Sequence, residues 1–219
     1  MIASSHGALL GLVASAVLVC AVVTLWRRRL SSIVKALAVQ GIALGLVAVL
    51  LGIDQHDLVL IAVGVVVVAV KGGVIPALLQ RILTADVSNR EVAPLINVPA
   101  SLVGAALLTF LAFATTHSVV RLVGTRAGGF IPLGFATLLI GFFAMTIRRK
   151  AVSQIVGLLI VDNGIALIAF LATAGVPLLV ELGASLDVLL IVVVLRVLTV
   201  QMNSTFGNLD LDQLRELHD

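Results

Sequence analysis

The sequence predicts an all-α integral membrane protein with seven transmembrane helices, organised as two three-helix repeats in parallel orientation joined by a linking helix. Composition predicts the membrane class. Hydrophobic residues make up 61% of the 219 residues and charged residues only 11%, whereas soluble domains carry about 25% charged residues. The mean hydropathy is +1.24, and the apolar residues fall into runs of about 20, the length that spans a hydrocarbon core.

Seven such runs are separated by short polar segments. The first ends in three arginines, the reverse of the polarity of a secretory signal, so we expect an uncleaved first helix with Trp26 at the interface. The predicted spans are Ser5–Trp26, Ser31–Leu51, Leu58–Leu83, Leu95–Thr115, Phe130–Ile147, Ala151–Ala174 and Leu178–Val200.

Basic residues lie unevenly on the two sides of the membrane. Odd-numbered spans end on one side, here called side B, and the opposite side is side A. Side A holds only Arg121 and Arg126, which makes side B the cytoplasm by the positive-inside rule. The N-terminus is then outside and the C-terminus inside. Side B carries Arg27, Arg28, Arg29, Lys35, Arg81, Arg90, Arg148, Arg149, Lys150, Arg196 and Arg215.

An internal repeat supports the predicted architecture. The segment RRRLSSIVKALAVQGIALGLVAVL begins at Arg27 and parallels RRKAVSQIVGLLIVDNGIALIAFL, which begins at Arg148. The third helices of the two copies also end alike, in LLQRILT and VVLRVLT. The repeat unit is therefore three helices, with Gln40 of the first copy corresponding to Asp162 of the second. The predicted organisation is a first repeat over 1–90, a linking helix and external loop over 91–128, a second repeat over 129–202 and a cytoplasmic tail over 203–219.

Three predicted spans each carry one ionisable residue at membrane depth. Asp162 lies about 18 Å from side B, Asp187 about 13 Å from side A, and Lys71 near the midplane, at 1.5 Å per helical residue. A charge at such depth costs at least about 2.5–3.5 kcal/mol, and these residues usually face the bundle interior or a wet cavity. A line of buried acids and amines bridged by water can pass protons, so proton transfer is one interpretation of the pattern.

Three further polar residues belong to the same candidate set. Glu181 lies one to two turns shallower than Asp187, while Gln40 and Asn163 cannot titrate but can orient water or hydrogen-bond a carboxylate. A structural interpretation stays open for all of them, with the charges serving as ion pairs that fasten helices or subunits together. Lys71 precedes Gly72, Gly73 and Pro76, a combination that predicts a kink in the third span.

Metal and redox chemistry are not expected on this chain. The lone Cys20 excludes an internal disulfide, a CxxC pair or a four-thiolate iron–sulfur site. His6, His117 and His218 are scattered and give no metal-ligand spacing, and His56 is expected to be a solvated turn residue. We therefore assign no catalytic, cofactor-binding or metal-ligating residue.

Several local strings resemble the membrane component E of hydrogenase-4, a subunit of formate-hydrogenlyase complexes. The clearest runs from Gln154-Ile155-Val156-Gly157 to Asp162-Asn163-Gly164, where that family has a glutamate before Asn-Gly. A second runs from Glu181-Leu182-Gly183 to Asp187, and Lys71 with Pro76 matches the family's lysine followed by a proline.

The C-terminal three helices also resemble the K subunit of respiratory complex I, with an Arg-Arg start and a tail like Asn208-Leu209-Asp210-Leu211-Asp212. In this resemblance Asp162 and Asp187 stand in for two intramembrane glutamates. Each is displaced by about a turn and is one methylene shorter.

These resemblances imply a non-catalytic membrane-arm subunit of a group 4 nickel–iron hydrogenase complex in a bacterial or archaeal cell membrane, with no cofactor of its own. Its partners would be complex I-like anchor and antiporter-like subunits and a peripheral hydrogenase arm, and no nucleic acid. Two alternatives stay open. The chain could be a purely structural scaffold of that complex, or a stand-alone secondary transporter with the same three-plus-one-plus-three plan. Spans one, two and six lack the prolines on which such carriers rely.

Overall fold

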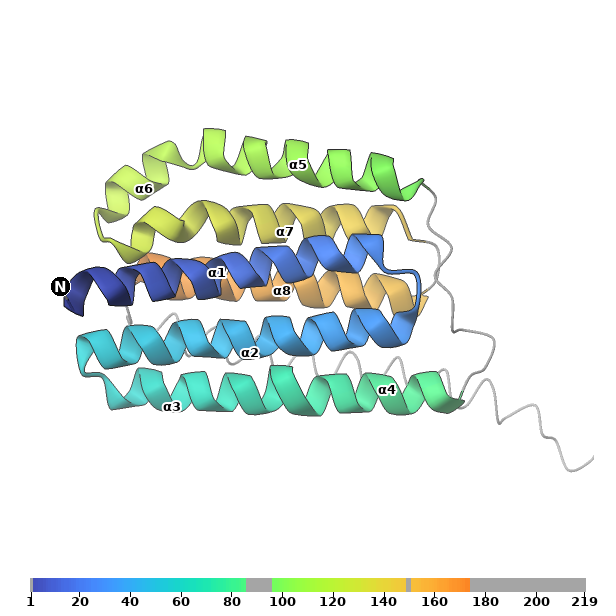
Figure 1. The fold of residues 1–219 in the computed structure, drawn as a ribbon, viewed down its shortest axis with the longest axis horizontal. Helices are drawn as coiled ribbons and strands as arrows, with labels where there is room; N and C mark the ends of the chain where they lie inside the picture. The colour runs from blue at the N-terminus through green and yellow to red at the C-terminus, as the bar shows by residue number, and fades with distance from the viewer. Residues whose placement is uncertain (1, 86–95, 149–150, 174–219) are drawn as a thin grey trace, which may run out of the picture. The chain divides into compact units, whose positions relative to one another are not determined.

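The computed structural model describes residues 2–85, 96–148 and 151–173, all within one compact unit. In these ranges the chain is helical apart from short turns and contains no β-strand. Six helices there are long and apolar enough to cross a membrane (Figure 1). The predicted all-helical class is confirmed for these residues, and their long apolar helices fit a multi-pass membrane protein. The seventh predicted span, Leu178–Val200, and the tail lie outside them.

The first half consists of three antiparallel apolar helices (Figure 1). The first two are α1 (Ile2–Trp26) and α2 (Leu30–Gln55), joined by a short turn of three exposed arginines. The third is continuous and has three parts: α3 (Leu58–Val67), a π-helical turn η1 (Val68–Val74) and α4 (Ile75–Ala85).

The turn between α2 and α3 explains why α2 is a full turn longer than its apolar run. The helix continues through Gln55 and ends where His56 adopts left-handed backbone angles, φ 56° and ψ 32°, a common way to terminate a helix. Asp57 then caps α3, since its Oδ1 accepts hydrogen bonds from the backbone N–H groups of Val59 (2.8 Å) and Leu60 (3.3 Å). His56 is exposed, as expected of a turn histidine.

The third span contains a local widening in place of a break. At the end of η1 the N–H of Ile75 bonds to the carbonyl of Val70, five residues back. Pro76 has no N–H, and its ring would clash with the carbonyl four residues earlier in a regular α-helix, so a wider turn relieves that clash. The structure has a π-helical turn where the sequence predicts a kink, and such turns are frequent at functional sites. Lys71 lies within it.

The second half begins with a peripheral helix and ends with a closely packed pair. A proline at the first turn suits the start of both α5 and α7, because the missing N–H has no partner there anyway. The elements are α5 (Val98–Thr115), α6 (His117–Val123), the short 3₁₀ turn η3 (Ala127–Phe130), α7 (Ile131–Thr146) and α8 (Ala151–Thr173).

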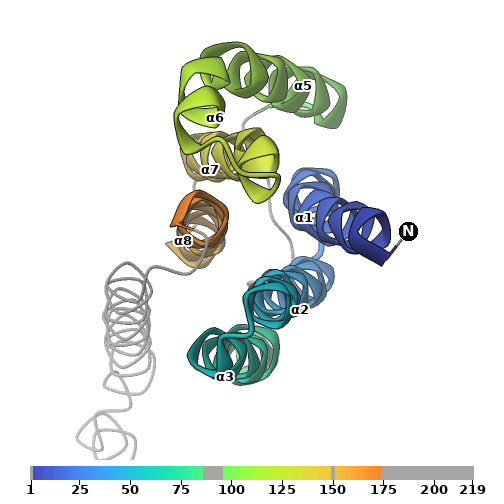
Figure 2. The same ribbon diagram turned by 90° about the vertical axis from the view of Figure 1, so that its left-hand side faces the viewer.

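Four helices, α1, α2, α7 and α8, form the centre of the unit (Figure 2). Helix α1 packs on α2 and α7, while α2 also packs on α8. Glycines allow the close contacts: a Cβ on Gly141 of α7 would lie 2.6 Å from the backbone nitrogen of Val161 on α8. Small residues that bring backbones together are the usual device for packing helices in lipid. This packing places α2 against both η1 and α8, the three elements that carry Gln40, Lys71, Asp162 and Asn163.

Candidate functional site

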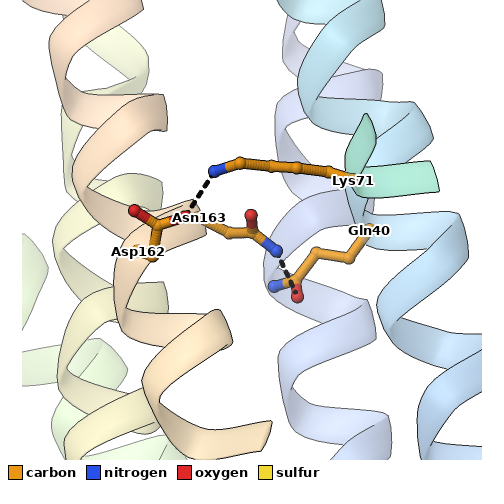
Figure 3. A network of polar contacts seen from close by, with 4 residues as sticks. All are labelled: Gln40, Lys71, Asp162 and Asn163. Carbon is orange, nitrogen blue, oxygen red and sulfur yellow. Dashed lines mark hydrogen bonds and ion pairs between the residues drawn. The ribbon is translucent and has the colours of Figure 1, made fainter. Parts of the chain in front are cut away.

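A buried ion pair joins the third and sixth spans. Lys71 of η1 places its Nζ 2.5 Å from Oδ2 of Asp162 on α8 (Figure 3). Lys71 is 5% exposed and Asp162 is 4% exposed. Removing one member of a buried pair leaves an uncompensated charge and costs about 3–5 kcal/mol. The ion pair therefore holds the two spans together, because separating the charges without giving each another partner would cost several kcal/mol.

Two amides form a second buried contact beside this pair. Asn163 of α8 donates from Nδ2 to Oε1 of Gln40 on α2, at 3.1 Å. Gln40 in turn donates from Nε2 to the backbone carbonyl of Val17 on α1, at 3.0 Å. Both side chains are buried, and Gln40 is 0% exposed. A hydrogen-bonded line thus runs from α1 through α2 to α8, adjacent to the ion pair (Figure 3).

The close approach of α2 and η1 sets the position of Lys71. A Cβ on Gly41 would lie 2.5 Å from the carbonyl carbon of Lys71 and 2.6 Å from its carbonyl oxygen. Any larger residue at this position would have to displace the Lys71 backbone. Gly41 follows Gln40 directly, so one turn of α2 both supports the lysine backbone and presents the amide.

The four side chains of this site, Gln40, Lys71, Asp162 and Asn163, offer one ammonium, one carboxylate and two amides. An ammonium and a carboxylate in direct contact can hold or exchange a proton, and amides can orient what passes between them. Within the described ranges, no three His, Cys, Asp or Glu residues gather where they could hold a metal ion. The geometry fits proton handling or helix fastening.

The structure brings four of the six predicted site residues together. Lys71, Asp162, Gln40 and Asn163 form one buried group, in which Lys71 contacts Asp162 and Asn163 contacts Gln40. Asp187 and Glu181 lie outside the described residues. A role in proton transfer stays a prediction for all six.

Arg148 is a buried polar residue that the sequence did not single out. It was expected only as one of the side B charges, yet it is 3% exposed, and its Nη2 donates to the carbonyl of Thr24 at 2.7 Å. That carbonyl lies in the last turn of α1, where carbonyls lack helical partners and a cation is favourable. Its Nη1 is buried and has no hydrogen-bond partner among the described residues. No sequence signal separates Arg148 from its neighbours, because burial here depends on how α7 meets α1.

Arg148 lies just beyond the apolar part of α7. Burial removes water from its guanidinium and lowers its pKa to about 10. At neutral pH the side chain is still charged. It therefore ties α7 to the end of α1 at the expense of a buried cation.

Comparisons with known proteins identify a relative without a described activity. No family model matches the chain, and no solved structure matches it. The chain is 49% identical over 207 residues to the uncharacterized protein Rv0085 of Mycobacterium tuberculosis (strain ATCC 25618 / H37Rv), an alignment that covers 94% of each protein. Because nearly half of the residues agree over almost the full length of both proteins, the chain belongs to the same family as Rv0085.

Proposed function

We propose that this chain is a non-catalytic membrane-arm subunit of a complex I-like group 4 nickel–iron hydrogenase or formate hydrogenlyase, contributing intramembrane residues to proton translocation or to coupling. Its partners would be anchor and antiporter-like membrane subunits and a peripheral hydrogenase arm. The local resemblances described above motivate the choice of complex. The family relationship to Rv0085 does not indicate an activity, because Rv0085 is itself uncharacterized.

One observation carries the proposal: a lysine and an aspartate in direct contact, both at least 95% buried, within two apolar spans. Intramembrane ionisable residues are rare, and proton relays are a main reason for their presence. The adjacent Gln40 and Asn163 supply polar groups that could order water beside the pair.

The finer architecture belongs to the same proposal. It comprises seven spans, two parallel three-helix repeats with a linking helix, an outside N-terminus, a cytoplasmic C-terminus and a place in a bacterial or archaeal cell membrane. The charge asymmetry between the two sides supports the orientation, and the matching segments from Arg27 and Arg148 support the repeat.

The test is Asp162→Asn in the native host, which keeps the side-chain shape but cannot carry a proton. Asp54→Asn is the matched control, because Asp54 is exposed in the loop after α2. Co-purification with a nickel–iron subunit measures assembly, and hydrogen formation with the proton gradient in inverted vesicles measures coupling. We expect Asp162→Asn to assemble and to lose the gradient, and Asp54→Asn to behave as wild type. A normal gradient in an assembled Asp162→Asn complex would exclude the proton-path function.

The scaffold function is a second candidate, favoured by the way the ion pair and the Gln40 hydrogen bonds join α1, α2, η1 and α8. In this case Lys71→Asp and Asp162→Lys would each prevent assembly, and the double exchange would restore both assembly and the gradient. Restored assembly without a gradient would favour the proton path instead.

A further inference from the structure

The backbone carbonyl of Val17 fixes the orientation of two buried amides. A carbonyl can only accept, so the Gln40 side chain must present its NH₂ group to Val17, where Nε2 lies 3.0 Å from the oxygen. The Gln40 oxygen therefore faces the other way, toward α8. It accepts from Nδ2 of Asn163 at 3.1 Å. The Val17 carbonyl thus fixes the orientation of the Gln40 amide, and the Gln40 oxygen fixes that of the Asn163 amide.

The same chain of contacts leaves the Asn163 oxygen on the opposite side of its amide. Figure 3 shows Oδ1 of Asn163 on the side that faces the Lys71 side chain, with Nδ2 turned to Gln40. If either amide were rotated, two oxygens or two NH₂ groups would meet in a buried environment, which is costly. The Val17 carbonyl therefore holds a neutral acceptor on the side of Asn163 that faces the Lys71 side chain.

Asp162 has one charged neighbour among the described residues, the Lys71 ammonium. Helix α7, which packs on α8, carries no titratable residue between Ile131 and Thr146. On α2 the titratable residue nearest in sequence to Gln40 is Lys35, which is exposed. On α1 the described titratable residues are Cys20, which follows Val17 by three residues, and His6, which lies near the N-terminal end of the helix.

We propose that Asn163 Oδ1 is a second acceptor for the Lys71 ammonium, held in position by Gln40 and the Val17 carbonyl. When a proton arriving from water converts the Asp162 carboxylate to the neutral acid, the ammonium keeps its three protons and its hydrogen bond passes to Asn163. Loss of that proton from Asp162 returns the ammonium to the carboxylate. Gln40 and Asn163 are positioning residues in this scheme, and the scheme deepens the proposed function on which it rests.

The first experiment needs no activity. The full-length chain is labelled with ¹⁵N-lysine and with ¹³Cγ-asparagine, and solid-state NMR in bilayers measures the distance from lysine Nζ to asparagine Cγ. In Asp162→Leu we expect a distance below about 4.5 Å, as a hydrogen bond of about 2.9 Å to the amide oxygen requires. Asp162→Leu/Asn163→Leu assigns the signal, because it removes the labelled carbon at that site. No lysine–asparagine contact in Asp162→Leu would overturn the proposal.

The second experiment uses the assembled complex and a pair of substitutions at one position. Gln40→Met keeps the volume and removes both hydrogen bonds, so we expect the gradient to fall about tenfold or more at every pH, because misplaced groups transfer protons poorly. Gln40→Glu can make the same two hydrogen bonds only as the neutral acid, which donates to the Val17 carbonyl and accepts from Asn163. Its gradient should approach wild type at acidic pH and fall toward that of Gln40→Met at alkaline pH.

The two proposals fail in different ways. If Asp162→Asn leaves the gradient normal, the proton-path function is lost whatever the NMR distance is. If Asp162→Asn loses the gradient while Gln40→Met keeps it, or Gln40→Glu follows wild type at every pH, the second acceptor is lost and the proton path stands. A role of Gln40 in packing alone would leave Gln40→Met and Gln40→Glu without a difference in pH profile.

Discussion

Lys71 and Asp162 lie in apolar helices, and each is acceptable there because of the other. Continuum arguments and experiments agree that a buried pair adds little net stability over an apolar replacement, whereas half a pair is strongly destabilising. Stability alone is therefore a weak reason to keep both charges, and this favours a role in transport or in specifying the assembly.

Substitutions of the pair test this directly. We expect Lys71→Met to lower the free energy of unfolding in mixed micelles by about 3–5 kcal/mol, because Asp162 is left buried and unpaired. The double variant Lys71→Met/Asp162→Leu should recover most of the loss while remaining inactive in proton translocation. A double variant as unstable as the single one would show that the two side chains do not form the contact described here.

Arg148 presents the opposite balance, since its burial cost is only partly offset. The hydrogen bond to Thr24 is favourable, but Nη1 has no partner among the described residues. Replacing such a buried charge by an apolar residue of similar volume is often neutral or stabilising. We therefore expect Arg148→Met to unfold at the same or a higher detergent concentration than wild type, whereas Arg148→Ala should unfold earlier because it leaves a cavity.

The pH dependence of Arg148 has a defined sign. The pKa of the folded guanidinium is about 10, well below that of the ordinary, solvated side chain. Between these values the unfolded chain binds the proton that the folded chain has lost, so stability rises with pH in that window. The stability of wild type relative to Arg148→Met should accordingly increase from about pH 10 upward and be constant at neutral pH. A difference that changes near neutrality would contradict the assignment.

At the scale of the elements, the register between α2 and η1 controls where the ammonium lies. We expect Gly41→Ala to cost about 1–3 kcal/mol, because its Cβ would overlap the Lys71 backbone and the packing must shift. The same variant should weaken coupling by moving Nζ away from Asp162. Gly73→Ala is the control. Gly73 lies in η1, the π-helical turn that contains Lys71, and a Cβ there meets nothing within 4 Å. Equal behaviour of the two variants in unfolding and coupling assays would contradict this register.

The helical elements were predictable, but the contacts between them were only partly so. Apolar runs located the six described spans, and shared depth predicted that Lys71 and Asp162 lie at one level. Which side chain Gln40 contacts depends on the rotation of α2 against α8, which hydropathy does not encode. The aligned glycines illustrate this: Gly41 packs against Lys71 in the third span, whereas Gly164 packs against Leu138 in α7. The burial of Arg148 depends on tertiary packing in the same way.

At the scale of the whole molecule, the proposed orientation can be read by chemical labelling. In a Cys20→Ala background, Asp54→Cys and Ser31→Cys place single thiols at exposed positions at opposite ends of α2. We expect a membrane-impermeant maleimide to label Asp54→Cys in intact cells and Ser31→Cys only in inverted vesicles. The reverse pattern would place the side B arginines outside and contradict the positive-inside assignment.

The ion pair also bears on how the protein is made. Lys71 and Asp162 are 91 residues apart in the chain, so synthesis at about 5–20 residues per second separates their appearance by about 5–18 seconds. During that interval the third span must enter the bilayer with an unneutralised ammonium, carried by the strong hydropathy of Leu58–Arg81. The third span should therefore be less stably inserted in nascent chains stalled before α8 than in completed chains. Biogenesis factors would encounter Lys71 before Asp162 has been synthesised.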